Sequence, residues 1–564
     1  MALCTCRPEG PAFRTALQGF DCRPVQDTVK PKSHRFRRVA GSQRSAPGAA
    51  KTTPGLCCEH RPITLLLCIR SPIVPGKMQK KKDNFAGPSV RVRTLGCKVN
   101  FCDGRALLDA LTAAGLPTRT GGLPADIEVV NTCAVTARSV QKARSLIRRL
   151  RKANPAPSII VTGCAARVPE DAFSKVPEAD AICPFPRDVI AWLARRYGIP
   201  VTELPPGSLD FDRTRAFVKI QDGCQAGCAY CVVPAARGVQ KSLEASEALR
   251  LVTEAVERGY HEVVICGIHL GQYGRDLGGT SLVDIMRAIA GIRGRFRVRL
   301  SSIEPLEVTD ALLEVMGAGE RFCPHLHLPL QSGSDKILKA MGRPYGAGEY
   351  FEVLERARRF LNNPAITTDI MVGFPGETPE DHRLTVEAIR KAGFARAHVF
   401  MFSARPGTRA ALMPDRVAGR EARRRSLEAR CAGSESARTF RRTLTGTVAQ
   451  VVVESVEDNL AEGLCRRYQR VRFRLNAGPV SSPARRGRDA VGTGEPNAGK
   501  SRRPARKGGR GGEEMRSGGP CRYGTGRWQK PDGAGKQGQL WDRTVDVCII
   551  GEAGNGILEG RLLE

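Results

Sequence analysis

The chain has 564 residues, 41% of them hydrophobic, and a formal net charge of +32. Its length predicts about three or four domains and excludes a small secreted disulfide scaffold, so the 20 cysteines are better explained as reduced, cytoplasmic thiols that serve metal. The charge favours RNA, DNA or an anionic surface as a partner, and no apolar run is long enough to predict a membrane span.

Two segments lack the periodicity of helices or strands and carry much of the charge, about +11 in residues 1–88 and about +8 in residues 477–542. We expect residues 1–88 to be disordered or to reflect a mis-assigned start, with Met78 as a plausible true start. A transit peptide is the alternative, because the segment is rich in Arg and poor in acidic residues. Residues 477–542 are rich in Gly, Pro and Arg, which predicts a disordered basic insert.

Residues 89–205 alternate between strand and helix patterns. The strands are "VRVRTLG", "IEVVNT" and "SIIVTG", and the helices run over Asp103–Ala114, closed by Gly115, and up to Leu150. This alternation predicts an α/β domain with a doubly wound parallel sheet.

Residues 206–418 contain a second alternating series. Helical stretches such as Glu247–Arg258 and Gly348–Leu361 separate the strands. Six βα units are more than one mononucleotide-binding half of an open sheet contains. They predict a partial (β/α)6 barrel, with its site at the carboxyl ends of the strands. These strands are "FVKI", "EVVICG", "FRVRLSS", "HLHLPL", "AITTDIMVGF" and "ARAHVFMF".

The remainder begins with an Arg-rich helical connector over residues 419–441. Residues 442–564 then show short alternating strands, "LTGTVAQVVVE" and "YQRVRFRL", and strand patterning returns after the basic insert. We therefore predict one small C-terminal β-barrel that residues 477–542 interrupt.

Three cysteines, Cys224, Cys228 and Cys231, lie within "DGCQAGCAYC", just after the first strand of the second series. At these spacings three thiolates can reach one metal centre at the carboxyl end of the scaffold. On a four-iron cube, three protein ligands leave one iron free for a substrate or cofactor. The alternative is a zinc site completed by a remote His or Cys.

Three more cysteines, Cys97, Cys133 and Cys164, each follow a different predicted strand of the first domain. In a doubly wound sheet these strand ends line one crevice, so the three distant thiols should converge. A second three-ligand cluster explains them better than ordinary core cysteines do. Cys102 and Cys183 have no equivalent placement and are interpreted as ordinary thiols.

The motifs around these cysteines resemble those of the radical S-adenosylmethionine (SAM) methylthiotransferases. The resemblance covers about residues 90–475 and 543–564, and "LGCKVN" is most similar to the branch that acts on N6-threonylcarbamoyladenosine in tRNA. The isopentenyladenosine branch and the ribosomal-protein branch carry different residues around Cys97. The motifs are "TLGCKVN", "VVNTCAVT", "VTGCAAR", "DGCQAGCAYC", "VVPAARG", "SSIEP", "HLHLPLQSGSDKILKAMGRPY", "TTDIMVGFPGET" and "FMFSARPGT".

The resemblance implies two [4Fe–4S] clusters and SAM as cofactors. Cys224, Cys228 and Cys231 would hold the cluster that cleaves SAM, and the other three cysteines an auxiliary cluster that carries the inserted sulfur. It also implies tRNA as substrate, a TRAM-like C-terminal barrel, a flavodoxin- or ferredoxin-like electron donor and a separate sulfur source, and we expect a monomer. Radical chemistry suits an aromatic C–H bond, which no general base can deprotonate.

Further residues near strand ends are candidates for SAM binding. Tyr230 is placed to pack near the SAM adenine, Gly267 to let SAM approach the backbone, and Glu304 to bind its polar groups; core packing or a plain turn is the alternative. The histidines His269, His325 and His327 are interpreted as core or rim residues. After "RGVQ" the chain has "KSLEAS", where the family has a basic Arg-Ser-Arg run.

Two other functions compete with the enzyme on tRNA. The same chemistry on an aspartate of a ribosomal protein would predict a less basic appended domain and a different sequence around Cys97. A non-catalytic zinc- and RNA-binding protein would predict colourless protein with one or two zinc ions, and it does not explain two sets of three strand-end cysteines.

Overall fold

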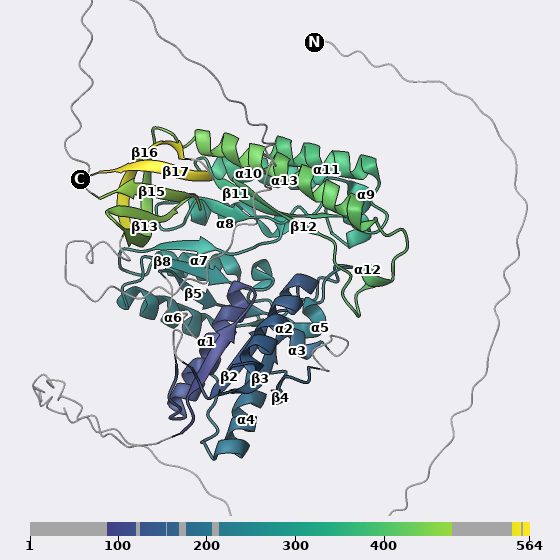
Figure 1. Ribbon diagram of the computed structural model, residues 1–564. Helices are drawn as coiled ribbons and strands as arrows, with labels where there is room; N and C mark the ends of the chain where they lie inside the picture. The colour runs from purple at the N-terminus through teal and green to yellow at the C-terminus, as the bar shows by residue number, and fades with distance from the viewer. Residues whose placement is uncertain are drawn as a thin grey trace, which may run out of the picture. The chain divides into compact units, whose positions relative to one another are not determined.

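The computed structural model describes residues 87–119, 124–153, 155–168, 176–205, 214–475, 544–553 and 556–563 (Figure 1). The predictions for residues 1–86 and for the insert 477–542 lie outside these ranges. In the described part of the chain, no helix is both long and apolar enough to cross a membrane.

The amino-terminal sheet is parallel and doubly wound, as predicted. Its named strands are hydrogen-bonded in chain order, and Thr118 bridges the free side of Val90. The Val90 amide donates to Pro117 O at 2.8 Å and the Arg119 amide donates to Val90 O at 2.8 Å. The chain therefore steps to one side of the first strand and then crosses to the other, and this reversal makes a switch point. The strands are β1 (Val90–Thr94), β2 (Ile127–Thr132), β3 (Ser158–Gly163) and β4 (Ala181–Ile182).

Helices cover both faces of this sheet because alternate strand residues are buried in two separate cores. Val130 and Val161 pack with one helix, α2, whereas Val129 and Ile160 pack with α1 and α4. The first helix begins five residues earlier than predicted, since burial of Val99 against the next sheet stabilises its first turn. These helices are α1 (Lys98–Ala113), α2 (Ala137–Arg151), α3 (Cys164–Arg167) and α4 (Pro186–Tyr197).

The central part contains the six predicted parallel strands. They form two three-stranded ladders, which parallel bridges join at Val298–Phe322 and Ser302–His327. The chain-order arrangement confirms the partial (β/α)6 barrel. The strands are β5 (Ala216–Lys219), β8 (Glu262–Cys266), β9 (Arg297–Leu300), β10 (His325–His327), β11 (Ala365–Val372) and β12 (Arg396–Met401).

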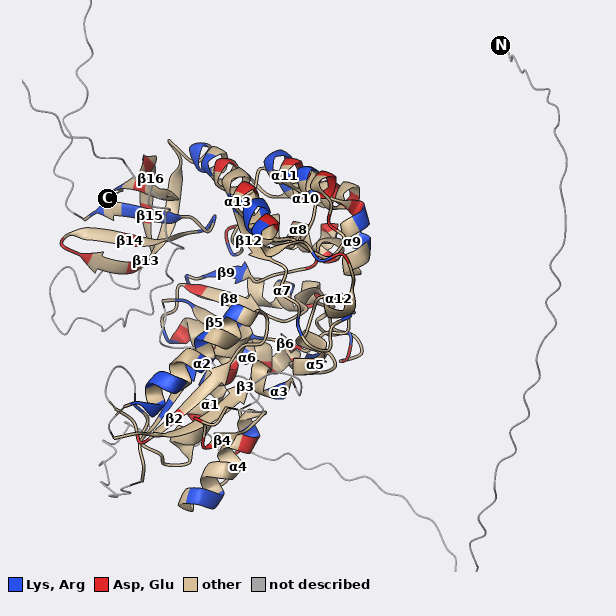
Figure 2. Cartoon of the chain, turned by 45° about the vertical axis from the view of Figure 1, so that its right-hand side comes forward, with Lys and Arg blue, Asp and Glu red and all other residues tan. Residues whose placement is uncertain are grey.

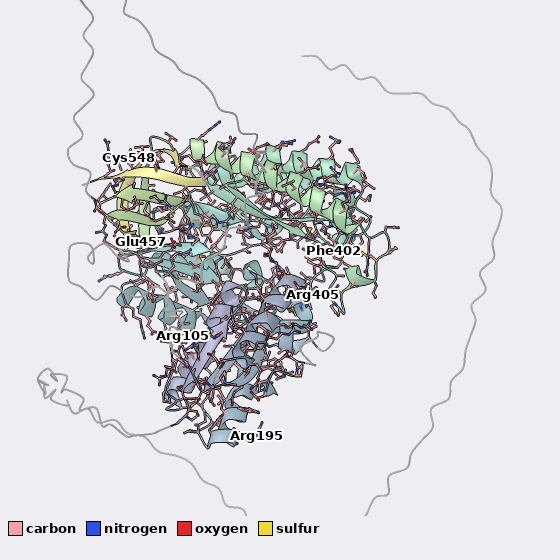
Figure 3. All side chains as sticks on the ribbon, in the orientation of Figure 1. Arg105, Arg195, Phe402, Arg405, Glu457 and Cys548 are labelled. Carbon is pink, nitrogen blue, oxygen red and sulfur yellow. The ribbon has the colours of Figure 1, made fainter. Side chains whose placement is uncertain are left out.

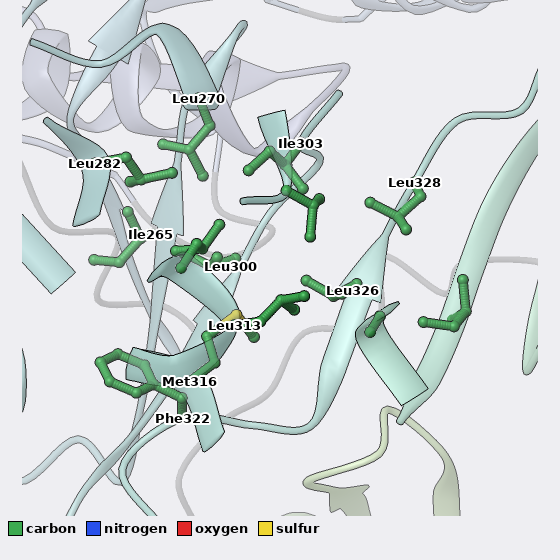
Figure 4. Close-up of a cluster of buried hydrophobic side chains, with 14 of the residues drawn as sticks. Ile265, Leu270, Leu282, Leu300, Ile303, Leu313, Met316, Phe322, Leu326 and Leu328 are labelled. Carbon is green, nitrogen blue, oxygen red and sulfur yellow. The ribbon is translucent and has the colours of Figure 1, made fainter. Parts of the chain in front are cut away.

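Apolar side chains from these strands pack against the surrounding helices, as Figure 4 shows for Ile265, Leu300 and Leu326 beside Leu313 and Met316. Ser or Thr caps begin four of the helices, by accepting a hydrogen bond from a backbone amide in the first turn. The main helices are α5 (Val233–Arg237), α6 (Ala245–Glu257), α7 (Leu282–Ala290), α8 (Asp310–Gly317), α9 (Asp335–Met341), α10 (Ala347–Phe360) and α11 (Pro379–Ala392), and a short hairpin pairs β6 (Gln221–Asp222) with β7 (Lys241–Ser242).

The connector forms one helix, α13 (Gly419–Arg442), which leads into a closed five-stranded barrel. The predicted small β-barrel is thus confirmed, although its second strand was not predicted because "LAEGLC" lacks strong strand formers. Figure 3 labels Glu457, which ends the first barrel strand, and Cys548 in the fourth. The strands are β13 (Val448–Glu457), β14 (Leu460–Cys465), β15 (Arg470–Arg474), β16 (Thr544–Ala553) and β17 (Ile557–Leu562).

A buried charge cluster joins this barrel to the amino ends of the central strands. Glu262 begins β8 and pairs with Arg297 at 2.6 Å and with Arg299 at 2.7 Å. Arg297 also donates to the backbone oxygens of Gln450 and Leu464, both at 2.8 Å. The barrel is therefore held at the ends of β8 and β9 that lie opposite the carboxyl ends.

Candidate active site

The structure brings Cys97, Cys133 and Cys164 together at the switch point of the amino-terminal sheet. Cys97 caps α1, Cys133 follows β2 directly, and Cys164 begins α3 directly after β3. The Cys133 thiol interacts electrostatically with both of the others, and Cys164 interacts with Cys97. We call these residues the strand-end set. The predicted convergence is therefore present.

Two glycines allow the loops of the strand-end set to approach one another. Gly96 has φ +118° and Gly163 has φ +92°, which few other residues adopt. A Cβ at Gly96 would lie 2.8 Å from Cys133 Cβ, and one at Gly163 would lie 2.2 Å from Asn131 Oδ1 and 2.7 Å from the Thr132 backbone. Any side chain at these positions would push the cysteine loops apart.

Asn100, to which sequence reasoning gave no role, ties the same loops together. Its side-chain amide donates to Leu95 O at 2.6 Å and to Thr132 O at 3.2 Å. Its backbone oxygen accepts from Asn131 Nδ2 at 2.9 Å, and its side-chain oxygen lies 3.9 Å from the Cys164 sulfur. One buried side chain thus links the ends of three strands.

Cys224, Cys228 and Cys231, which we call the loop set, lie in one loop after β6. The Cys228 thiol interacts with that of Cys224, and the Cys231 thiol interacts with both. The loop is held by hydrogen bonds from the Cys231 amide to Cys228 O at 3.1 Å and from the Cys224 amide to Gly238 O at 3.2 Å. Three thiols on eight residues therefore face one another without help from distant strands.

Burial keeps thiols of both sets protonated in the absence of metal. It raises the pKa of Cys133 to about 11 and that of Cys231 to about 12. It also raises the pKa of Cys164 and of Cys228. Metal binding would displace these protons, since thiolates are the ligands.

No three His, Cys, Asp or Glu side chains among the described residues close around a single metal ion. A four-iron cluster makes a different demand, because its three thiolates bind three different irons. Two sets of three cysteines, each next to a buried arginine described below, fit such clusters in donor type and in charge.

Arg343 extends over the loop set and was not predicted. Its Nη1 donates to the Cys228 sulfur at 3.3 Å, its Nε donates to Tyr345 Oη at 3.1 Å, and its Nη2 pairs with the Glu304 carboxylate. The predicted Glu304 therefore lies close to Cys228. Tyr230 lies here too, half-buried against a cluster that contains Ile337, Met341 and Phe374.

His269 contacts the loop set, although it was interpreted as a core or rim residue. Its Nδ1 lies 3.4 Å from the Cys224 sulfur and its Nε2 lies 2.8 Å from Glu307 Oε1. Burial lowers the pKa of this imidazole, but the hydrogen bonds with Cys224 and Glu307 outweigh it and raise the pKa to about 10. Gly267 lies nearby and packs closely against Gln221. A Cβ at Gly267 would lie 3.0 Å from Gln221 Oε1. The close packing gives Gly267 a structural reason to be glycine, and its contact with SAM stays a prediction.

A buried network of charges connects the two cysteine sets. Asp103 of α1 pairs with Lys219 at 2.5 Å and with Arg237 at 2.9 Å, and Asp222 accepts from the same two cations at 3.2 and 2.9 Å. Arg237 also interacts with the thiols of Cys164 and Cys97. Burial alone would raise the pKa of Asp103, but the two cations outweigh it and lower the pKa.

Polar side chains from the three adjacent strands β10, β11 and β12 lie close to one another. His327 Nδ1 lies 2.9 Å from Thr367 Oγ1, its Nε2 lies 3.4 Å from Asp369 Oδ2, and its ring lies 6.1 Å from that of His398. Lys98, next to Cys97, interacts electrostatically with His398. We call Lys98, His327, Asp369 and His398 the polar group.

Comparisons with known proteins agree with this geometry. A family model described as "Radical SAM superfamily" matches residues 218–389, and one described as "Uncharacterized protein family UPF0004" matches residues 89–184. The two matches contain the loop set and the strand-end set, respectively.

Curated relatives match most of the chain. Threonylcarbamoyladenosine tRNA methylthiotransferase MtaB of Thermotoga maritima is 39% identical over 338 residues, which is 58% of this chain and 77% of the relative. The protein of the same name from Bacillus subtilis is 32% identical over 407 residues, which is 68% of this chain and 90% of the relative. tRNA-2-methylthio-N(6)-dimethylallyladenosine synthase of Mycobacterium bovis is 38% identical over 360 residues, covering 58% and 70%.

Proposed function

The chain belongs to the radical SAM tRNA methylthiotransferases, enzymes with [4Fe–4S] clusters and SAM, and from this premise we propose that it methylthiolates N6-threonylcarbamoyladenosine at position 37 of tRNA. The product is the 2-methylthio derivative. Adenosine 37 lies next to the anticodon.

Each cysteine set has one role in this proposal. Cys224, Cys228 and Cys231 would hold the cluster that binds SAM, and Cys97, Cys133 and Cys164 would hold the auxiliary cluster. When bound, the cluster at the loop set would supply the electron for reductive cleavage of SAM, and the cluster at the strand-end set would carry the sulfur for insertion, with a second SAM as the methyl donor. A flavodoxin- or ferredoxin-like protein supplies electrons, and a separate donor supplies sulfur.

The protein's own contribution at the loop set is to orient SAM and to balance charge. Three half-buried thiolates on one loop carry negative charge, and Arg343, 3.3 Å from Cys228, offsets part of it. Glu304 fixes the other side of the same guanidinium. Its remaining oxygen and the Tyr230 ring offer a polar and an apolar contact to SAM.

At the strand-end set, Arg237 has the equivalent role. Its guanidinium is held by Asp103 and Asp222 and interacts with two of the three thiols. Asn100 and the two close-approach glycines keep the thiols at the strand ends. The auxiliary cluster would therefore sit on a rigid frame between the sheets.

The polar group carries the choice of nucleoside. A threonylcarbamoyl substituent has a carboxylate, a hydroxyl and a urea, whereas a dimethylallyl substituent is hydrocarbon. Lys98 is adjacent to Cys97 and interacts with His398, and the Asp369 and His327 side chains are 31% and 16% exposed. A cation with partly open hydrogen-bonding neighbours suits an acidic, polar substituent and would leave polar atoms unpaired against hydrocarbon.

The test is mass spectrometry of tRNA nucleosides from a strain that lacks the gene. We expect the 2-methylthio derivative of threonylcarbamoyladenosine to disappear and to return when the gene is restored. Loss of the isopentenyladenosine derivative instead would refute the choice of nucleoside, and loss of neither would refute the action on tRNA.

A Lys98→Leu variant tests the observation that carries the choice. We expect it to retain iron, since Lys98 is not a ligand, and to restore much less of the product. The matched Lys391→Leu variant changes an exposed lysine of α11 that lies over the Phe351 ring, and it should restore the product fully at equal expression. Full activity of Lys98→Leu would contradict the role of the polar group.

A further inference from the structure

Helix α2 has an unusual charge. It holds six arginines and lysines over Ala137–Arg151, Lys152 caps it, and it has no acidic residue (Figure 2). Every other described helix of eight or more residues contains Asp or Glu. Neither the fold nor the cysteine chemistry requires such a helix.

The cations lie on the face of α2 that points away from the sheet. Val140, Ala143, Ile147 and Leu150 are buried against the strands. At spacings of four, seven and three residues, the opposite face presents an exposed row, which we call the cationic ridge and which spans about 21 Å along the helix. It consists of Arg138, Lys142, Arg149 and Lys152.

No residue of the cationic ridge forms an ion pair with another described residue. Two neighbouring arginines differ, because Arg148 pairs with Glu178 at 3.2 Å and Arg151 with Asp180 at 2.6 Å. Acidic side chains are thus within reach of this helix, but they neutralise its flank and leave the ridge positive.

The ridge is unfavourable for the isolated helix. Like charges four and three residues apart repel one another, as Arg138 does Lys142 and Arg149 does Lys152. Arg138 also lies in the first turn, where the helix dipole disfavours a positive charge. A polyanion along the ridge would relieve both effects.

The ridge begins at the candidate active site. Cys133 precedes α2 by four residues, and Thr136 caps the helix by accepting from the Ser139 amide at 3.1 Å. The Ala137 amide donates to Ser403 Oγ, just beyond β12, at 3.4 Å. The ridge therefore extends outward from the carboxyl ends of both sheets.

We propose that the cationic ridge binds the phosphate backbone of the tRNA whose adenosine occupies the active site. The inference rests on the proposed function, because it takes its ligand from it. Phosphates spaced along one strand match a row of unpaired cations, and such contacts position the nucleic acid without reading its sequence. The ridge would fix the approach of the RNA beside the target nucleotide.

The experiment measures tRNA binding to the full chain, loaded with iron and sulfur, at salt concentrations from about 50 to about 200 mM. The ridge variant carries Arg138→Gln, Lys142→Gln, Arg149→Gln and Lys152→Gln. The control variant removes the same charge from exposed arginines on and after α7 and on α10, with Arg287→Gln, Arg293→Gln, Arg295→Gln and Arg359→Gln.

We expect the ridge variant to lose affinity by roughly tenfold to a hundredfold, and the slope of log affinity against log salt to fall by about 3. SAM cleavage without tRNA should be unchanged, since the ridge touches neither cysteine set. The control should keep the wild-type slope.

Wild-type affinity and slope in the ridge variant would overturn the ridge alone and leave the proposed function standing. Equal losses in ridge and control variants would also overturn it, since bulk charge would then explain binding. A wild-type chain that binds no tRNA would overturn both proposals.

Discussion

The two cysteine sets occupy equivalent places in two different sheets but are encoded differently. The loop set lies within eight residues after β6, so its spacing alone brings the thiols together. The strand-end set is spread over 68 residues by numbering, from Cys97 to Cys164, and only the strand order assembles it. The first is a local motif and the second is a product of topology.

The supports differ in the same way. The loop set relies on turn hydrogen bonds and on Arg343, which comes from 115 residues away. The strand-end set relies on Gly96, Gly163 and Asn100, which are next to its own cysteines or strands. Both sets therefore take their charge balance from an arginine distant in the sequence, Arg343 or Arg237, and the strand-end set has packing supports beside its own ligands as well.

The largest expected effects separate the two sets by function. Cys228→Ala should abolish SAM cleavage, whereas Cys133→Ala should spare SAM cleavage and stop sulfur insertion. Each variant should bind about four irons, against about eight in the wild type, because the proposal assigns one four-iron cube to each cysteine set. The readouts are iron analysis, 5′-deoxyadenosine release and nucleoside mass spectrometry. Equal loss of SAM cleavage in both variants would show that the sets do not act separately.

The second prediction concerns the charges that join the sets. Asp103→Asn removes one anion from a buried network with two cations, which should lower the free energy of unfolding by about 3–5 kcal/mol. The auxiliary cluster should be lost before the other, since Asp103 lies on the helix that Cys97 caps. Chemical unfolding and iron retention measure the two effects.

Glu380→Gln is the control for this change, because Glu380 is an exposed partner in a surface pair with Arg383. Because this pair is fully exposed to solvent, Glu380→Gln should leave the unfolding midpoint unchanged. Equal costs for Asp103→Asn and the control would contradict a buried coupling between the sets.

Sequence reasoning predicted what periodicity and spacing encode. The predicted strand ends brought Cys97, Cys133 and Cys164 to one edge of the sheet, and the two sheets and the barrel followed from alternation. The cluster-binding roles of all six cysteines stay predictions. It missed Arg343 and Asn100, although both lie in motifs that were recognised, "MGRPY" and "LGCKVN". Their roles depend on contacts with residues distant in sequence. An arginine is expected at the surface unless a buried partner for its charge is known.

The earlier start of α1 has the same explanation. "CKVNF" has weak helix signals, and its first turn is helical because Val99 and Cys102 are buried with Phe217 of the central sheet. The sequence pattern predicts no strand before Cys183. In the structure Cys183 directly follows β4, whose two residues are too few to predict a strand from a pattern. It is buried in the core instead of facing the other thiols.

The third prediction tests whether the strand-end set depends on close approach. Gly163→Ala should cost about 1–3 kcal/mol from backbone strain and more from its contacts with Asn131 and Thr132. Gly115→Ala is the matched control, because Gly115 also has positive φ, +86°, and faces open space. Only the first variant should lose the auxiliary cluster, as measured by iron content and absorbance, and both should keep SAM cleavage. Retention of both clusters in Gly163→Ala would show that the loops tolerate separation.

The smallest expected effect is a pH dependence of the unfolding free energy, which should be seen only in the metal-free chain. Burial raises the pKa of Cys133 from its ordinary 9.0 to about 11 and that of Cys231 to about 12. As pH rises above 9 the unfolded thiols ionise first, so the metal-free chain should lose stability from about pH 9 up to the folded pKa values. Cluster-bound cysteines are already deprotonated and should not contribute. Cys133→Ser and Cys231→Ser should each flatten the fall in unfolding midpoint between about pH 8 and about pH 10 in the metal-free chain. If only one of the two variants flattens the pH dependence, burial controls thiol ionisation in one cysteine set and not in the other. The two sets would then differ in the ionisation of their thiols as well as in how the sequence brings them together.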